Sequence, residues 1–80
     1  MRIRFTRSAR KHRIGKAHAL HVINTATPTI IPADETNDER RVYVGPDDRD
    51  LELEIVAIVL PDYLLVIHVM PTALRRRRTS

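Results

Sequence analysis

Hydrophobic and polar residues alternate most regularly in the C-terminal half of the chain. Residues 51–60 alternate at first and then become continuously apolar, as in a central strand with one face fully covered and the other partly covered. The pair Pro61-Asp62 is a turn signal, and residues 63–70 predict an antiparallel partner strand that Pro71 ends. The pattern therefore predicts a β-hairpin.

Shorter strands are predicted before this hairpin. Residues 40–44 alternate and lead into a turn cluster at 45–48. Residues 29–31 are a short strand candidate that Pro32 stops, and residues 2–6 are a possible first strand.

The segment between the first two strand candidates is predicted to be helical. Residues 8–26 have a helical composition, with apolar side chains three and four positions apart. Gly15 is a poor helix residue, so we expect two short helices or a bend at this point. Ser8 is expected to cap the first helix, and Thr27 to end the helical region because it precedes a proline.

This order of elements predicts an α+β fold. Two N-terminal helices are expected to pack on a three- to four-stranded antiparallel sheet. We expect a single domain over residues 1–70, followed by a basic C-terminal tail at 71–80.

The hairpin register predicts which side chains share a face. If Leu60 pairs with Tyr63, then Ile55 pairs with His68, which puts His68 on the apolar face that carries the helices. The other face is also apolar near the turn and has no predicted cover, which indicates an interface. The expected interface residues are Val56, Ile58, Leu65 and Ile67. A three-residue loop would exchange the two faces.

Charge is segregated along the sequence. Residues 1–27 carry seven basic side chains and no acid, residues 28–70 carry ten acids and three arginines, and residues 71–80 carry four arginines. The block charges of +7, −7 and +4 sum to the net charge of +4. Basic segments beside an acidic body indicate a polyanionic partner.

Length and composition narrow the class of protein. A domain of 80 residues buries a limited surface, so association with another chain is expected to support it. The absence of cysteine excludes disulfides and thiolate metal sites. Charged residues follow Met1, and no apolar run approaches the ~20 residues of a membrane span, so neither a signal peptide nor a membrane contact is expected. These features predict a cytoplasmic protein.

The basic segments supply candidate phosphate ligands, because the arginine fork donates two parallel hydrogen bonds to a phosphate. The residues expected to contact RNA or phosphate are Arg7, Lys11, Lys16, Arg75, Arg76, Arg77 and Arg78. For the N-terminal segment the alternatives are a solvated basic helix face or an acidic protein partner, and for the tail a solubilising end. Aromatic residues are few, which argues against an RNA-recognition module of the stacking type.

Catalysis, if present, is expected to depend on His68. Cleavage of RNA by its own 2′-hydroxyl needs a proton acceptor, a proton donor and cations for the charge of the phosphorane. His68 is the candidate for proton transfer or phosphate contact, with Arg10 and Arg13 as catalytic cations. A structural histidine within the core is the alternative for His68.

Other chemistry-bearing residues give weaker signals. Glu52 and Glu54 share a strand face, where solvent-facing alternation is favoured over a role as base or as Mg²⁺ ligands. His18 and His21 lie three residues apart, but neither a cysteine nor a nearby carboxylate accompanies them. No metal and no cofactor is therefore expected.

Several weak motifs follow one another in a particular order. They are residues 4–14 with Ala17 and residues 21–23, the strand Arg40-Arg41-Val42-Tyr43-Val44-Gly45, and the paired segments 53–59 and 64–70. In this order, over residues 4–70, they resemble the BrnT-like toxins of the RelE/ParE-type superfamily, which belong to type II toxin–antitoxin modules. The resemblance implies helices packed on an antiparallel sheet, mRNA endoribonuclease activity or gyrase inhibition, and neutralisation by an antitoxin.

The chain departs from this family after its last strand. Family members often continue with a helix that holds tyrosine and arginine, whereas here Pro71 and a short arginine-rich tail follow. Our first hypothesis is a metal-independent mRNA endoribonuclease toxin that inhibits translation. The alternatives are a non-catalytic module that binds an antitoxin or nucleic acid, and a gyrase inhibitor. The expected partners are a cognate antitoxin, free or ribosome-bound RNA, and further chains in a homo- or hetero-oligomer.

Overall fold

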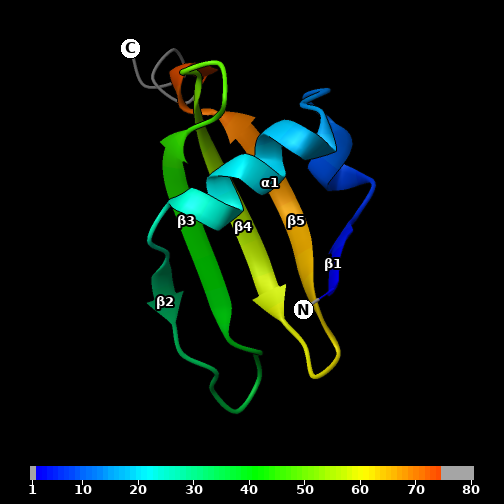
Figure 1. Cartoon of the computed structure of the whole chain (residues 1–80). Helices are drawn as coiled ribbons and strands as arrows, with labels where there is room; N and C mark the ends of the chain where they lie inside the picture. The colour runs from blue at the N-terminus through cyan, green and yellow to red at the C-terminus, as the bar shows by residue number, and fades with distance from the viewer. Residues whose placement is uncertain (1, 75–80) are drawn as a thin grey trace.

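The computed structural model describes residues 2–74 of the chain (Figure 1). Within this range, in chain order, the elements are β1 (Arg2–Phe5), the 3-10 turn η1 (Ser8–Arg10), α1 (Lys16–Thr25), β2 (Thr29–Ile31), β3 (Arg40–Pro46), β4 (Glu52–Val59) and β5 (Tyr63–Pro71). The five predicted strand segments are confirmed, since their bounds differ from the expected ones by at most two residues.

The predicted fold class is wrong in the composition of the sheet. The strands form one five-stranded sheet in the order β1-β5-β4-β3-β2. The sheet is mixed, because β1 runs parallel to β5 while the other neighbouring strands are antiparallel. A parallel pair needs a long crossover instead of a tight turn, so no local turn signal indicates it.

The fold class is also wrong in the number of helices, since one α-helix packs on the sheet in the described part of the chain. The expected first helix is the single turn η1. Its continuation is blocked at Arg13, which has a left-handed φ of 57°, and α1 begins only after the extended backbone of Gly15. No helix among residues 2–74 is long and apolar enough to cross a bilayer.

A β-bulge in β5 overturns the predicted face of His68. Pairing begins as expected on both sides of the Pro61-Asp62 turn. Further along β5 the register shifts by one residue, so that Ile67 has no partner on β4 and His68 lies opposite Val56. The expected pairing of His68 with Ile55 is therefore wrong, and His68 leaves the face that α1 covers.

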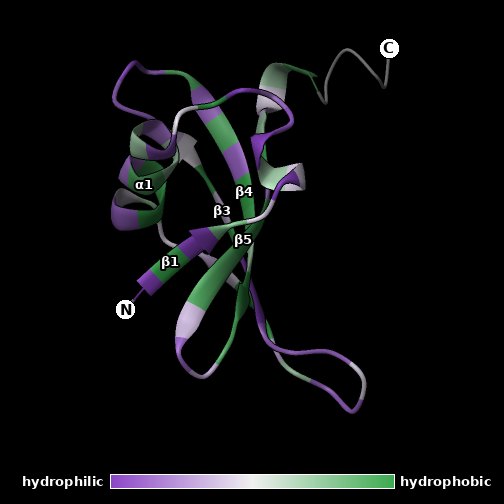
Figure 2. Ribbon diagram, turned by 90° about the vertical axis from the view of Figure 1, so that its right-hand side faces the viewer, coloured by the Kyte–Doolittle hydropathy of each residue, from purple (hydrophilic) through white to green (hydrophobic). Residues whose placement is uncertain are grey.

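The core lies between α1 and one face of the sheet. α1 packs over β3 and β4, as Figures 1 and 2 show from two directions. Ala19 and Val22 of α1 are fully buried there. They pack in one cluster with the sheet residues Tyr43, Leu53, Ile55, Ala57, Leu64, Val66 and Val69. α1 does not cover the other face of the sheet.

We call this other side the open face. Its residues alternate with those of the core and include Val42, Val44, Glu54, Val56, Ile58, Leu65, Ile67 and His68. The four predicted interface residues, Val56, Ile58, Leu65 and Ile67, lie outside the core cluster and are half-buried. The open face therefore presents the expected apolar surface, and its coverage by a partner stays a prediction.

Candidate nucleic-acid interface

Seven basic side chains of the N-terminal segment form one exposed border of the molecule. They are Arg2, Arg4, Arg7, Arg10, Lys11, Arg13 and Lys16, which we call the basic edge. All seven are exposed. β1 carries the first two, η1 and its flanking loops carry the next four, and α1 begins with the last. Because β1 is the outer strand beside β5, this segment follows one border of the sheet (Figure 1).

None of the ion pairs found among residues 2–74 involves the basic edge. These pairs are His18–Asp48, Arg41–Glu39, Arg49–Asp47 and His68–Glu54. The loop between β2 and β3, which holds several acidic residues, lies at the lower end of the sheet in Figure 1, below β3. Within residues 2–74 the basic edge is therefore not neutralised by ion pairs, although Asp62 lies beside Arg2 and Arg4.

Hydrogen bonds to β5 hold η1 at this border. The backbone N–H of Thr6 donates to the carbonyl of Val66 over 3.0 Å, one residue beyond β1. Ser8 Oγ donates to the carbonyl of Ile67 over 3.2 Å. The predicted role of Ser8 as a helix cap is wrong, because the backbone N–H of Ala9 donates to Thr6 Oγ1 instead. Ser8 attaches η1 to the bulged strand.

Aromatic rings steady two of the basic side chains. The guanidinium carbon of Arg4 lies 4.9 Å from the centroid of the Tyr63 ring, and Lys16 Nζ lies 5.8 Å from that of Phe5. A cation over a ring is attracted by the ring quadrupole and can still reach an anion from its other side. These two contacts therefore orient cations without neutralising them.

His68 makes its polar contact on the open face. Its Nε2 lies 3.1 Å from Glu54 Oε2, with 35% of the His68 side chain and 14% of the Glu54 side chain exposed. Neither Arg10 nor Arg13 has a hydrogen bond or ion pair with His68 among residues 2–74. His68 therefore contacts Glu54, a carboxylate that we expected to face solvent. The three predicted catalytic residues, His68, Arg10 and Arg13, are not in direct contact with one another.

The predicted phosphate ligands fall into two groups. Arg7, Lys11 and Lys16 belong to the exposed basic edge. Arg75, Arg76, Arg77 and Arg78 lie outside the described residues. The sequence did not single out Arg2 and Arg4 as phosphate ligands, although their charge and their alternation with Ile3 and Phe5 were visible.

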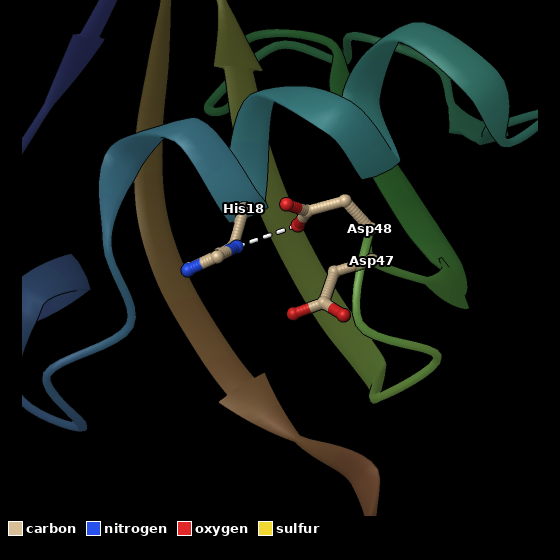
Figure 3. A group of neighbouring side chains, drawn as sticks. All are labelled: His18, Asp47 and Asp48. Atoms are coloured by element: carbon tan, nitrogen blue, oxygen red, sulfur yellow. Dashed lines mark hydrogen bonds and ion pairs between the residues drawn. The ribbon is translucent and has the colours of Figure 1, made fainter.

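A second cluster joins α1 to the turn between β3 and β4. His18 Nδ1 lies 2.5 Å from Asp48 Oδ1, and Asp47 lies beside this pair (Figure 3). The hydrogen bond from His18 lowers the pKa of Asp48. From the sequence, His18 was considered as a metal ligand only together with His21, because Asp48 is 30 positions away along the chain.

The Asp47 carboxylate is already used by the turn. Its Oδ1 accepts the backbone N–H groups of Arg49 and Leu51, and its Oδ2 accepts two guanidinium N–H groups of Arg49. Burial would by itself raise the pKa of Asp47, but these hydrogen bonds outweigh it and lower the pKa to about 2. The cluster therefore stabilises the turn between β3 and β4, and we assign no metal to it.

Comparison with known proteins gives no independent identification. No family model, characterised protein or solved structure matches the chain. The resemblance to BrnT-like toxins therefore stays a prediction.

Proposed function

We propose that this protein binds RNA through the basic edge. The observation that carries the proposal is a set of seven exposed cations along one border of the sheet, none of which has a carboxylate partner among residues 2–74. Such a border attracts a polyanion through the release of its counterions. Five of the seven cations are arginines, which both fork onto phosphates and stack on bases. This composition favours RNA over an acidic protein as the partner.

The position of the cations supports the binding of a single RNA strand along the border of the sheet. Arg2 and Arg4 project from β1 on alternate positions, while Ile3 and Phe5 pack against the core between them. η1 continues the border with Arg7 and Arg10. A flexible single strand can follow this path more easily than a straight duplex, because its backbone bends at each nucleotide.

Fluorescence anisotropy with a labelled single-stranded RNA tests the proposal. Arg10→Ala should weaken binding and reduce the slope of log affinity against log salt by about 0.7, the value for one lost phosphate contact on a single strand. Arg40→Ala is the matched control, because it removes the same charge from β3 near the other border of the sheet. Equal effects of the two variants, or no binding by the wild type, would rule the basic edge out as the RNA site.

RNA cleavage is a second candidate function, favoured by the His68–Glu54 pair. Glu54 holds Nε2 of the imidazole, which leaves Nδ1 to exchange a proton with the 2′-hydroxyl or the leaving group. His68 is on the side of the sheet toward which Arg4 projects, since Arg4 pairs with Leu65 in register. In this reading the protein is a metal-independent endoribonuclease toxin, and its partner is an antitoxin.

Cleavage is tested on free and ribosome-bound RNA in the presence of EDTA. The wild type should cut, His68→Ala should not, and Glu54→Gln should cut more slowly, while all three bind RNA alike. The control is Glu52→Gln, a neighbouring exposed carboxylate that bonds Thr72 and not His68. Absence of cleavage on both substrates, together with normal growth on expression, would exclude the nuclease and leave the binding function intact.

A further inference from the structure

The basic edge contains a hollow at its N-terminal end. Arg2, Arg4, Asp62 and Tyr63 line this hollow, which has a volume of about 410 Å³. It forms because β1 pairs in parallel with β5, which sets Arg2 beside Tyr63 and next to the Pro61-Asp62 turn. Residues of β1 and of the turn before β5, far apart in the sequence, thus meet at one place.

We propose that this hollow binds a guanine base of single-stranded RNA. The inference rests on the proposed RNA-binding function and names the base that the basic edge recognises. Guanine offers two acceptors, O6 and N7, on one edge and two donors, the N1–H and N2–H₂ groups, on its Watson–Crick edge. The guanidinium of Arg2 supplies donors for O6 and N7, and the carboxylate of Asp62 accepts from the N1–H and N2–H₂ groups.

Adenine does not fit the same set of groups. Its N6 amino group would direct a donor toward an arginine, and its N1 would direct a lone pair toward the carboxylate of Asp62. Both contacts would leave polar groups without a partner, which is the basis of strong discrimination at a base site.

The hollow also offers a flat surface for stacking. The Arg4 guanidinium lies 4.9 Å from the centroid of the Tyr63 ring, so the two planar groups form a small layered platform. Bases stack on arginine planes and on aromatic rings in single-stranded RNA complexes. The chain has too few aromatic residues for a module that stacks several bases, and this one platform fits one base.

Asp62 is the feature that points to a base and not to phosphate alone. It is an exposed acid at the end of a basic border, where it repels phosphate. Among residues 2–74 it forms no ion pair with Arg2 or Arg4, although all three line the same hollow. Its carboxylate is therefore open to a ligand that brings two N–H donors.

The test compares short oligouridine strands that carry one central substitution, by fluorescence anisotropy. Guanosine should raise the affinity about 10-fold over adenosine, as expected for a bidentate base contact. Inosine, which lacks the N2 amino group, and 7-deazaguanosine, which lacks N7, should each lose part of this gain. Equal affinities for the guanosine and adenosine strands would overturn the inference.

Two variants of residues that line the hollow, with one control variant, test whether the hollow is the source of the preference for guanosine. Asp62→Asn should abolish the preference for guanosine without weakening the binding of plain oligouridine, whereas Asp38→Asn, in the exposed loop between β2 and β3, should change neither. Tyr63→Leu should reduce the affinity for both purines. Retention of the guanosine preference in Asp62→Asn would overturn the site. Loss of binding to every strand in the wild type would instead overturn the RNA-binding function itself.

Discussion

Ser8 Oγ donates a hydrogen bond to the carbonyl oxygen of Ile67, the residue of β5 that has no partner on β4. The bond links the N-terminal segment to the bulge across 59 residues of sequence. It places η1, and with it Arg7 and Arg10, beside the strand that carries His68. The bulge therefore determines both the face of His68 and the attachment of the basic edge.

We expect Ser8→Ala to loosen this attachment. Because the hydrogen bond is exposed, its loss should lower the free energy of unfolding by about 0.5–1 kcal/mol, as measured by urea denaturation. Thr27→Ala is the control, since the Thr27 hydroxyl is exposed and makes no hydrogen bond within the described part of the chain. Equal losses in the two variants would mean that the Ser8 bond does not stabilise the fold.

Deletion of Ile67 tests the bulge directly. The deletion should leave His68 opposite Val56, because it removes the residue that has no cross-strand partner. We expect the protein to fold, with a loss of stability of about 1–2 kcal/mol. Deletion of Ala57 is the contrasting variant, since Ala57 pairs with Arg41 on β3 and with Val66 on β5, and its loss shifts β4 against both neighbouring strands. This variant should lose more than about 4 kcal/mol in urea denaturation, and similar losses for both deletions would contradict the assignment.

The elements of the fold that could be predicted from the sequence are those marked by residues within the element or directly beside it. The hairpin was predictable because alternation marks both strands and Pro61-Asp62 marks the turn. Residues 29–31 were predicted with the observed bounds, since proline stands on both sides of them. Each of these signals lies within the element that it specifies.

The parts that sequence did not predict depend on contacts between distant residues. No glycine or proline marks the bulge at Ile67, and its partners are Ser8 and the β4 ladder. The parallel pairing of β1 with β5 likewise has no turn signal. Because the bulge at Ile67 was not predicted, His68 was predicted on the wrong face of the sheet.

In the candidate site, too, features marked locally in the sequence were predictable, and features that depend on distant contacts were not. The basic edge was predictable in outline, because a run of cations without acids is visible in composition. The hollow was not, since Arg2 and Tyr63 become neighbours only through the parallel pairing. The His68–Glu54 contact was not predicted, because the predicted register put the two residues on opposite faces of the sheet.

Self-association is expected to use the open face. Val56, Ile58, Leu65 and Ile67 are half-buried there, and association would remove their remaining apolar surface from water. Sedimentation velocity of the wild type should therefore show a dimer that grows with concentration, and Ile58→Lys should abolish it. Ile30→Lys is the control, because Ile30 is 47% exposed but pairs with Arg41 on the side that α1 covers. A monomer at every concentration would exclude this use of the face.

Asp47 should make stability depend on acid pH. Its pKa is lowered from 3.8 to about 2 in the folded protein, because its hydrogen bonds to Arg49 and Leu51 outweigh the cost of burial. A group with a depressed folded pKa stabilises the protein above its unfolded pKa, and this stabilisation is lost as the pH falls through the folded value. The contribution of Asp47 should therefore be complete above pH 4 and disappear toward pH 2.

Asp47→Asn isolates this contribution from those of Asp34 and Asp48, whose pKa values are also lowered by hydrogen bonds. At neutral pH the variant should be less stable than the wild type by about 2 kcal/mol in urea denaturation. The difference should shrink as the pH is lowered from 4 to 2, because the wild-type carboxylate becomes protonated. Asp38→Asn, at an exposed position, should follow the wild-type curve. A difference that stays constant down to pH 2 would show that the Asp47 charge does not stabilise the turn.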